Sequence, residues 1–74
     1  MEFQEASDRA TGACITLADI AKECGTAPQT LRRARIDSES PNYRRPPDGW
    51  EAAIAKLARE RAAELVELAE ELEG

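Results

Sequence analysis

The segment from Thr16 to Arg35, TLADIAKECGTAPQTLRRAR, predicts two short helices joined by a tight turn. Thr16 is a residue type that caps helices, and Asp19 brings a negative charge to the first turn, where the helix dipole favours it. Gly25 is expected to end the first helix, because glycine readily adopts the left-handed backbone found at helix ends. The apolar residues before it recur at helical spacing: Leu17, Ile20, Ala21 and Cys24.

A second helix is expected to follow the glycine directly, with Thr26 as its cap and Pro28 in its first turn. Leu31 and Ala34 are its apolar positions, and Ile36 is expected to pack beneath its end. The small side chain of Ala21 allows the two helices to cross closely. The polar and basic residues of the second helix are expected on the outside: Gln29, Thr30, Arg32, Arg33 and Arg35.

This pattern resembles the helix-turn-helix of bacterial regulators. Within it, GTAPQTLRR at 25–33 is similar to MerR-type regulators and the related small excisionases, although Thr26 stands where an apolar residue is more usual. The resemblance covers roughly residues 15–46. It implies that the second helix enters a DNA major groove and that a wing follows it. The sequence PNYRRP at 41–46, an aromatic beside arginines, is similar in character to such a wing but shorter.

The resemblance also implies a set of DNA-contacting residues. Gln29, Arg32 and Arg33 are the expected base-contacting residues, since arginine recognises guanine and glutamine adenine, each pair contributing about 1–3 kcal/mol of discrimination. Tyr43 is expected in the wing, either contacting DNA or packing the loop. The residues expected to contact phosphates are Thr26, Thr30, Arg35, Arg44 and Arg45.

The remaining segments complete an all-α or mostly α prediction. Residues 1–13 show little periodicity and predict a flexible N-terminus. Residues 37–49 contain three prolines and predict a loop or short extended hairpin, which completes a DNA-binding unit over 14–49. Residues 50–74 contain a run without proline or internal glycine, and predict one helix from Trp50 to Glu73, about 36 Å long, with Asp48 as its cap.

The last helix is long for so small a chain, and only its first half can cover the helical pair. Trp50 is expected to anchor it on Leu31 or Ile36. Its second half needs another surface, which we expect to be a second copy; because Arg61 interrupts the apolar seam, a short antiparallel or four-helix contact fits better than a parallel zipper. The expected dimer-interface residues are Leu65, Val66, Leu68 and Leu72.

Charge is distributed unevenly along the chain, although the net charge is −5. Residues 26–47 hold five arginines against Asp37 and Glu39, whereas acidic residues are in excess on both sides. Because phosphate binding depends on the field within about 10 Å, the basic middle segment favours a DNA partner despite the overall charge.

Several classes of function have little support. The chain has no histidine, no nucleophile paired with a base and no phosphate-binding glycine loop, so neither catalysis nor a metal or cofactor is expected. Cys14 and Cys24 are expected to be small buried hydrophobes. Without a secretory signal or a membrane-length apolar run, a cytoplasmic location is expected.

The sequence therefore predicts a small bacterial or phage-type transcriptional regulator. It would be a repressor that binds double-stranded DNA as a homodimer, without a small-molecule effector. Two alternatives remain at this point. One is an excisionase or DNA-packaging accessory protein with the same contact residues, and the other is a protein-interaction adaptor that uses its acidic C-terminal helix.

Overall fold

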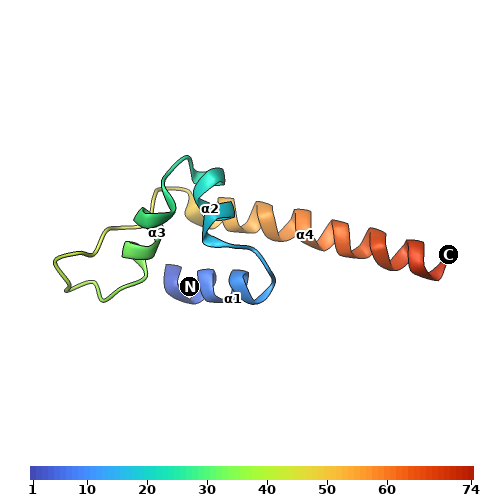
Figure 1. Cartoon of the computed structure of the whole chain (residues 1–74), viewed down its shortest axis with the longest axis horizontal. Helices are drawn as coiled ribbons and strands as arrows, with labels where there is room; N and C mark the ends of the chain where they lie inside the picture. Colours follow the sequence, from blue (N-terminus) through green and yellow to red (C-terminus); the bar gives the residue numbers. More distant parts are fainter.

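The computed structural model describes all 74 residues and consists of four helices without any strand. They are α1 (Phe3–Gly12), α2 (Leu17–Cys24), α3 (Pro28–Ala34) and α4 (Trp50–Glu73). The first three helices gather around the N-terminal half of α4, and the C-terminal half of α4 extends away from them (Figure 1). The molecule is consequently elongated, measuring 54 × 20 × 18 Å. The predicted all-α class is confirmed.

The start of α2 has the predicted cap. The Asp19 backbone N–H donates to the Thr16 hydroxyl at 3.1 Å, and the Thr16 backbone N–H donates to the Asp19 carboxylate at 3.0 Å. This reciprocal pair is a capping box, and it satisfies two donors that the helix itself leaves unpaired. The hydrogen bond from the Thr16 backbone lowers the pKa of Asp19 below its ordinary value of 3.8.

The turn between α2 and α3 depends on Gly25, which adopts the left-handed conformation with φ 72° as predicted. The Thr26 backbone N–H then donates to the Ala21 carbonyl at 2.9 Å and closes α2. Thr26 therefore takes part in closing α2 through its backbone, and its prediction as the cap of α3 is wrong. The cap position belongs to Ala27, which makes no side-chain hydrogen bond, and Pro28 is the first helical residue.

The N-terminal residues form a packed helix, so the predicted flexible terminus over 1–13 is wrong. Phe3 is only 4% exposed, and Ala6, Ser7 and Ala10 on the same face of α1 are also buried. The buried Ser7 hydroxyl donates to the Gln4 carbonyl at 3.1 Å, so it needs no partner outside the helix. A single large apolar residue at the start of α1 thus decides its packing.

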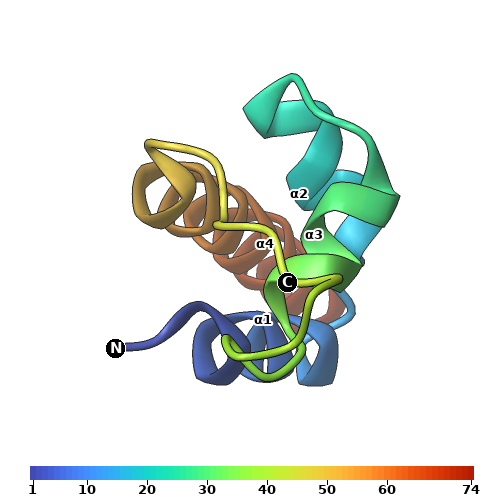
Figure 2. The ribbon, with the colours of Figure 1, turned by 90° about the vertical axis from the view of Figure 1, so that its left-hand side faces the viewer.

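The core is small and joins all four helices. Figure 2, which looks along α4, shows the other three helices beside it. Ile20 of α2 and Leu31 of α3 are fully buried at its centre. Trp50 is half-buried and packs edge-on against Phe3, with ring centroids 5.2 Å apart and planes at 84°. The expected partners of Trp50 were Leu31 or Ile36, but Ile36 is 40% exposed and does not pack beneath α3 as predicted.

Two further local predictions are corrected by the backbone. Cys14 is exposed and lies two residues beyond the end of α1, in the left-handed conformation with φ 67°, so it is not a buried hydrophobe. Cys24 is half-buried against the core, and this burial raises the pKa of its thiol. The cap position of α4 is Gly49, with φ 82° and no side-chain hydrogen bond, so Asp48 does not cap that helix.

The bounds of α4, Trp50 to Glu73, are confirmed as predicted. Its last half-buried residue is Arg61, and every residue after it is exposed. The large apolar side chains of this free half include Leu65, Leu68 and Leu72, which are 57%, 50% and 79% exposed. None of the four helices combines the length and hydrophobicity that crossing a membrane requires.

We expect Phe3→Ala to lower the free energy of unfolding by about 3 kcal/mol, because truncating a buried aromatic removes apolar contact and leaves a cavity. Chemical denaturation followed by helical circular dichroism measures the change. The control is Gln4→Ala, which alters the neighbouring exposed position and leaves the packing intact. An unchanged stability for Phe3→Ala would contradict the packing of α1.

We expect Thr16→Ala to lower the free energy of unfolding by about 1 kcal/mol through loss of the capping box. Because folding lowers the pKa of Asp19, its contribution is fully present above pH 3.8 and is lost as the pH falls through the lowered pKa. Denaturation of wild type and Thr16→Ala across this range measures both effects. Asp48→Ala is the control and should change stability by less than about 0.5 kcal/mol.

Candidate nucleic-acid interface

The packing of α2 on α3 fixes the face that α3 presents to solvent. Ile20 and Ala21 of α2 meet Leu31 and Ala34 of α3, and all four side chains are buried. Ala21 is 1% exposed, and its small side chain suits a close helix crossing. Since Leu31 and Ala34 lie one turn apart on the inner face, the side chains between them are directed outward.

The predicted base-contacting residues lie together on this outer face. Gln29 and Arg32 are exposed, Arg33 is half-buried, and these three line one shallow hollow with Ile36 and Asn42. Asn42 comes from the loop after α3, and its amide brings a further donor and acceptor to the same place. No sequence signal had singled out Asn42, because only the path of the loop brings it back to α3.

The loop over residues 37–49 is attached to α3 by its backbone. The Arg44 backbone N–H donates to the Arg33 carbonyl at 3.3 Å, and two local turns bring the Ser40 N–H to Asp37 and the Tyr43 N–H to Ser40. No strand forms, so the loop is not a two-stranded wing. Arg44 and Arg45 are exposed on the loop next to α3.

Tyr43 lies between the loop and the body of the molecule. It is half-buried and lines a hollow of about 410 Å³ together with Phe3, Ile36 and Trp50. Of the two roles considered for Tyr43, loop packing is the one for which this position is suited. Arg44 and Arg45 are thus carried by a loop that is bonded to α3 at Arg33 and whose Tyr43 faces the same hollow as Phe3 and Trp50.

The arginines of the outer face have no acidic partner within the chain. The structure contains two ion pairs, one between Arg35 and Asp8 and one between Lys56 and Glu23 at 2.6 Å. Neither pair involves the basic residues of the α3 face and loop. The guanidinium groups that remain unpaired there belong to Arg32, Arg33, Arg44 and Arg45. Such a cluster attracts anions, because no carboxylate lies within ion-pair distance of these four groups.

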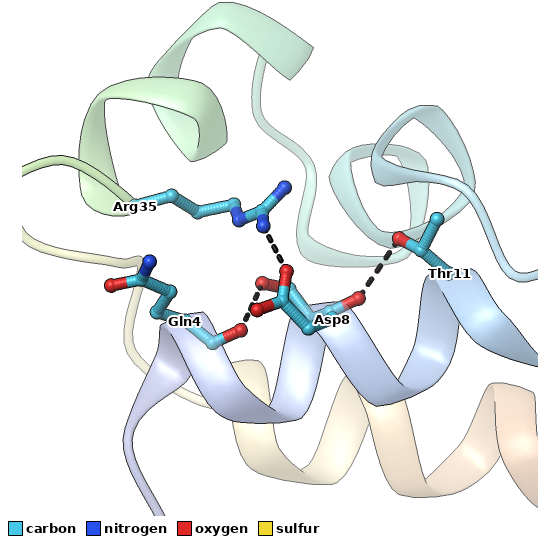
Figure 3. Close-up of polar contacts among 5 residues, drawn as sticks. Gln4, Asp8, Thr11 and Arg35 are labelled. Atoms are coloured by element: carbon cyan, nitrogen blue, oxygen red, sulfur yellow. Dashed lines mark hydrogen bonds and ion pairs between the residues drawn. The ribbon is translucent and has the colours of Figure 1, made fainter.

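Arg35 does not belong to this cluster, although the sequence predicts it as a phosphate contact. Its side chain is directed toward α1 and pairs with Asp8, while its Nε is buried without a partner (Figure 3). Asp8 lies 27 residues earlier in a segment predicted to be flexible, so nothing in the sequence indicated the pair. Arg35 instead connects the end of α3 to α1.

Thr26 and Thr30, the remaining predicted phosphate contacts, are half-buried at the start of α3. The Thr30 backbone N–H donates to the Ala27 carbonyl at 3.0 Å, which closes the first turn of the helix. Both threonines thus lie at the edge of the face that carries Gln29.

Comparisons of the chain with protein-family models, with curated protein sequences and with solved structures found no match.

We expect Gly25→Ala to lower the free energy of unfolding by about 1–2 kcal/mol. An added Cβ meets no atom within 4 Å, so the cost arises from the backbone conformation with φ 72° and not from a clash. Gly12→Ala is the matched control, because Gly12 is helical and equally open, and alanine there should leave stability unchanged or raised. Denaturation midpoints compare the two; equal effects would contradict the assigned role of Gly25.

Proposed function

We propose that the protein binds double-stranded DNA sequence-specifically as a small transcriptional regulator, with α2 and α3 acting as a helix-turn-helix. One observation carries the proposal: Gln29, Arg32 and Arg33 share one outward face of α3 and have no acidic partner. These are the side-chain types that recognise adenine and guanine edges in the major groove.

The dimensions of α3 suit this role. Seven residues give a helix of roughly 10 Å, and a major groove about 12 Å wide accepts one helix. Gln29 and Arg33 are four residues apart and Arg32 lies between them, so all three occupy about one turn. This turn lies close to the start of α3, and in helix-turn-helix proteins the N-terminal residues of the recognition helix are the ones that contact base edges.

The surrounding residues supply contacts that do not depend on sequence. Arg44 and Arg45 would grip the DNA backbone from the loop, and Thr26 and Thr30 would contact phosphates beside the start of α3. Tyr43 supports the loop from within. The loop would act as a wing without strands, its position set by Tyr43 and by the hydrogen bond from Arg44 to Arg33.

The protein would act as a cytoplasmic homodimer, since a two-fold pair of α3 helices matches two half-sites about 34 Å apart along the DNA. Occupying a promoter in this way makes repression the simplest outcome. An excisionase or DNA-packaging accessory protein would use the same residues on a different target. A selected binding sequence separates these roles, because repeated sites that bend favour the accessory role over a palindromic operator.

We expect the protein to bind duplex DNA with an affinity that falls steeply as salt rises, because binding releases counterions from the phosphates it neutralises. Arg32→Ala/Arg33→Ala should abolish selection of a preferred sequence and weaken binding to every duplex. Fluorescence anisotropy on random and selected duplexes at two salt concentrations measures both properties.

The matched control is Arg32→Lys/Arg33→Lys, which keeps the charge but cannot contact guanine bidentately. It should retain most of the salt-dependent binding to random DNA and lose the preference for the selected duplex by about tenfold or more. Absence of duplex binding at low salt by the folded wild type would overturn the proposal and would point to a protein partner on α4.

A further inference from the structure

An apolar groove runs between α1 and the first half of α4. Two adjoining hollows, of about 300 and 280 Å³, share Met1, Ala6 and Ile54. Alanines provide most of the remaining lining, and α4 contributes Ala55 and Ala58. Because alanine leaves space that a larger side chain would fill, the groove is shaped to accept bulky apolar groups.

The same face of α4 continues beyond the groove into the free half of the helix. At 100° per residue, Ile54, Ala58, Leu65 and Leu72 fall within an arc of about 40°. The first two line the groove, whereas the last two have nothing packed against them. The α4 face therefore carries exposed leucines in its free half and an open apolar groove, partly lined by alanines, in its first half.

Charge separates in the same way along α4. Residues 50–61 hold three basic and two acidic residues, whereas residues 62–74 hold five glutamates and no basic residue. Arg9 lines the groove from α1 and pairs with no carboxylate. The groove end of the helix thus carries one net positive charge, although Glu51 lines the groove and Lys56 is paired with Glu23, whereas the free end carries only negative charge.

We infer that the groove is the docking site for the C-terminal half of α4 from a second copy of this chain, arranged antiparallel. The inference rests on the homodimer of the proposed function and specifies how it forms. A parallel pairing would place ten glutamates side by side within a Debye length. The antiparallel pairing instead sets the five glutamates of each copy against Arg9 and a half of α4 whose net charge is +1.

The spacing of the residues defines one register. From Ile54 the groove face steps by four residues to Ala58, and from Leu72 the free half steps back by four to Leu68. Leu72 of one copy then lies against Ile54 of the other, and Leu68 against Ala58. The two-fold axis then passes at the level of residue 63, and Arg61 and Leu65 flank it on the groove face. Each tail fills the groove of its partner, as an amphipathic helix does in an apolar groove.

Sedimentation velocity over a concentration series tests the interface. We expect wild type to form a dimer, and Leu68→Glu to raise the dimer dissociation constant about tenfold or more while helical circular dichroism stays unchanged. The matched control is Ala63→Glu, which adds the same charge on the opposite side of the free half and should leave the dimer intact. A monomeric wild type, or equal effects of the two substitutions, would overturn the inference.

Disulfide trapping tests the orientation in the background Cys14→Gly/Cys24→Ala. Ala62→Cys should form a covalent dimer under mild oxidation, because residue 62 of each copy lies only one residue from the level of the axis. Leu72→Cys should not, because the two copies of residue 72 lie at opposite ends. Cross-linking through Leu72→Cys but not Ala62→Cys would overturn the antiparallel arrangement in favour of a parallel one.

The DNA-binding proposal is separately assayed. Leu68→Glu leaves α3 and its loop unchanged, so it should still bind duplex DNA in a salt-dependent manner, with weaker and less cooperative occupancy of a two-half-site operator. If Leu68→Glu loses the dimer but still binds a half-site, the result tests the α4 interface alone. If the wild type binds no duplex at all, the DNA-binding proposal fails independently of that interface.

Discussion

The edge-on contact between Phe3 and Trp50 joins the first helix to the last, and the arrangement of the other two depends on it. Once α1 and α4 are paired, the α2–α3 unit packs between them through Ile20 and Leu31. One ion pair then connects each helix of the unit to a framing helix, Arg35 to α1 and Glu23 to α4. Partly exposed pairs of this kind contribute little stability, but they restrict how the unit can rotate.

The small size of the core limits what the chain can do alone. Ile20, Leu31 and Ser7 are its largest fully buried residues, and most of the other buried positions are alanines. A domain of this length is marginal as a monomer, and its core gains no support from a disulfide because both cysteines are free. A second copy would bury leucines that the chain otherwise leaves in water, so oligomerisation and stability are physically connected here.

The elements predicted correctly from the sequence were those with local signals. Thr16 with Asp19, Gly25 and the uninterrupted run from Trp50 each fix a helix boundary through residues near in sequence. Helix α1 was missed because its burial depends on one aromatic whose partner lies 47 residues later. The Asp8–Arg35 pair was missed for the same reason, because its two residues lie 27 positions apart. The role of Thr26 was predicted incorrectly for a different reason. Its residue type suits a side-chain cap at the start of α3, but in the structure its backbone N–H closes α2 and Ala27 takes the cap position.

Arg61 marks the point at which α4 leaves the folded body. Its guanidinium donates to the Cys14 carbonyl at 3.3 Å, in the turn that ends α1, and no residue beyond it is buried. In a monomer the backbone amides of the free half would be held by helix hydrogen bonds alone and would exchange with solvent through fraying. Amide hydrogen exchange at residues 62–73 would thus report the association of two chains. Exchange at Ile20 or Leu31 would report the unfolding of one chain, so one exchange experiment would separate dimerisation from unfolding.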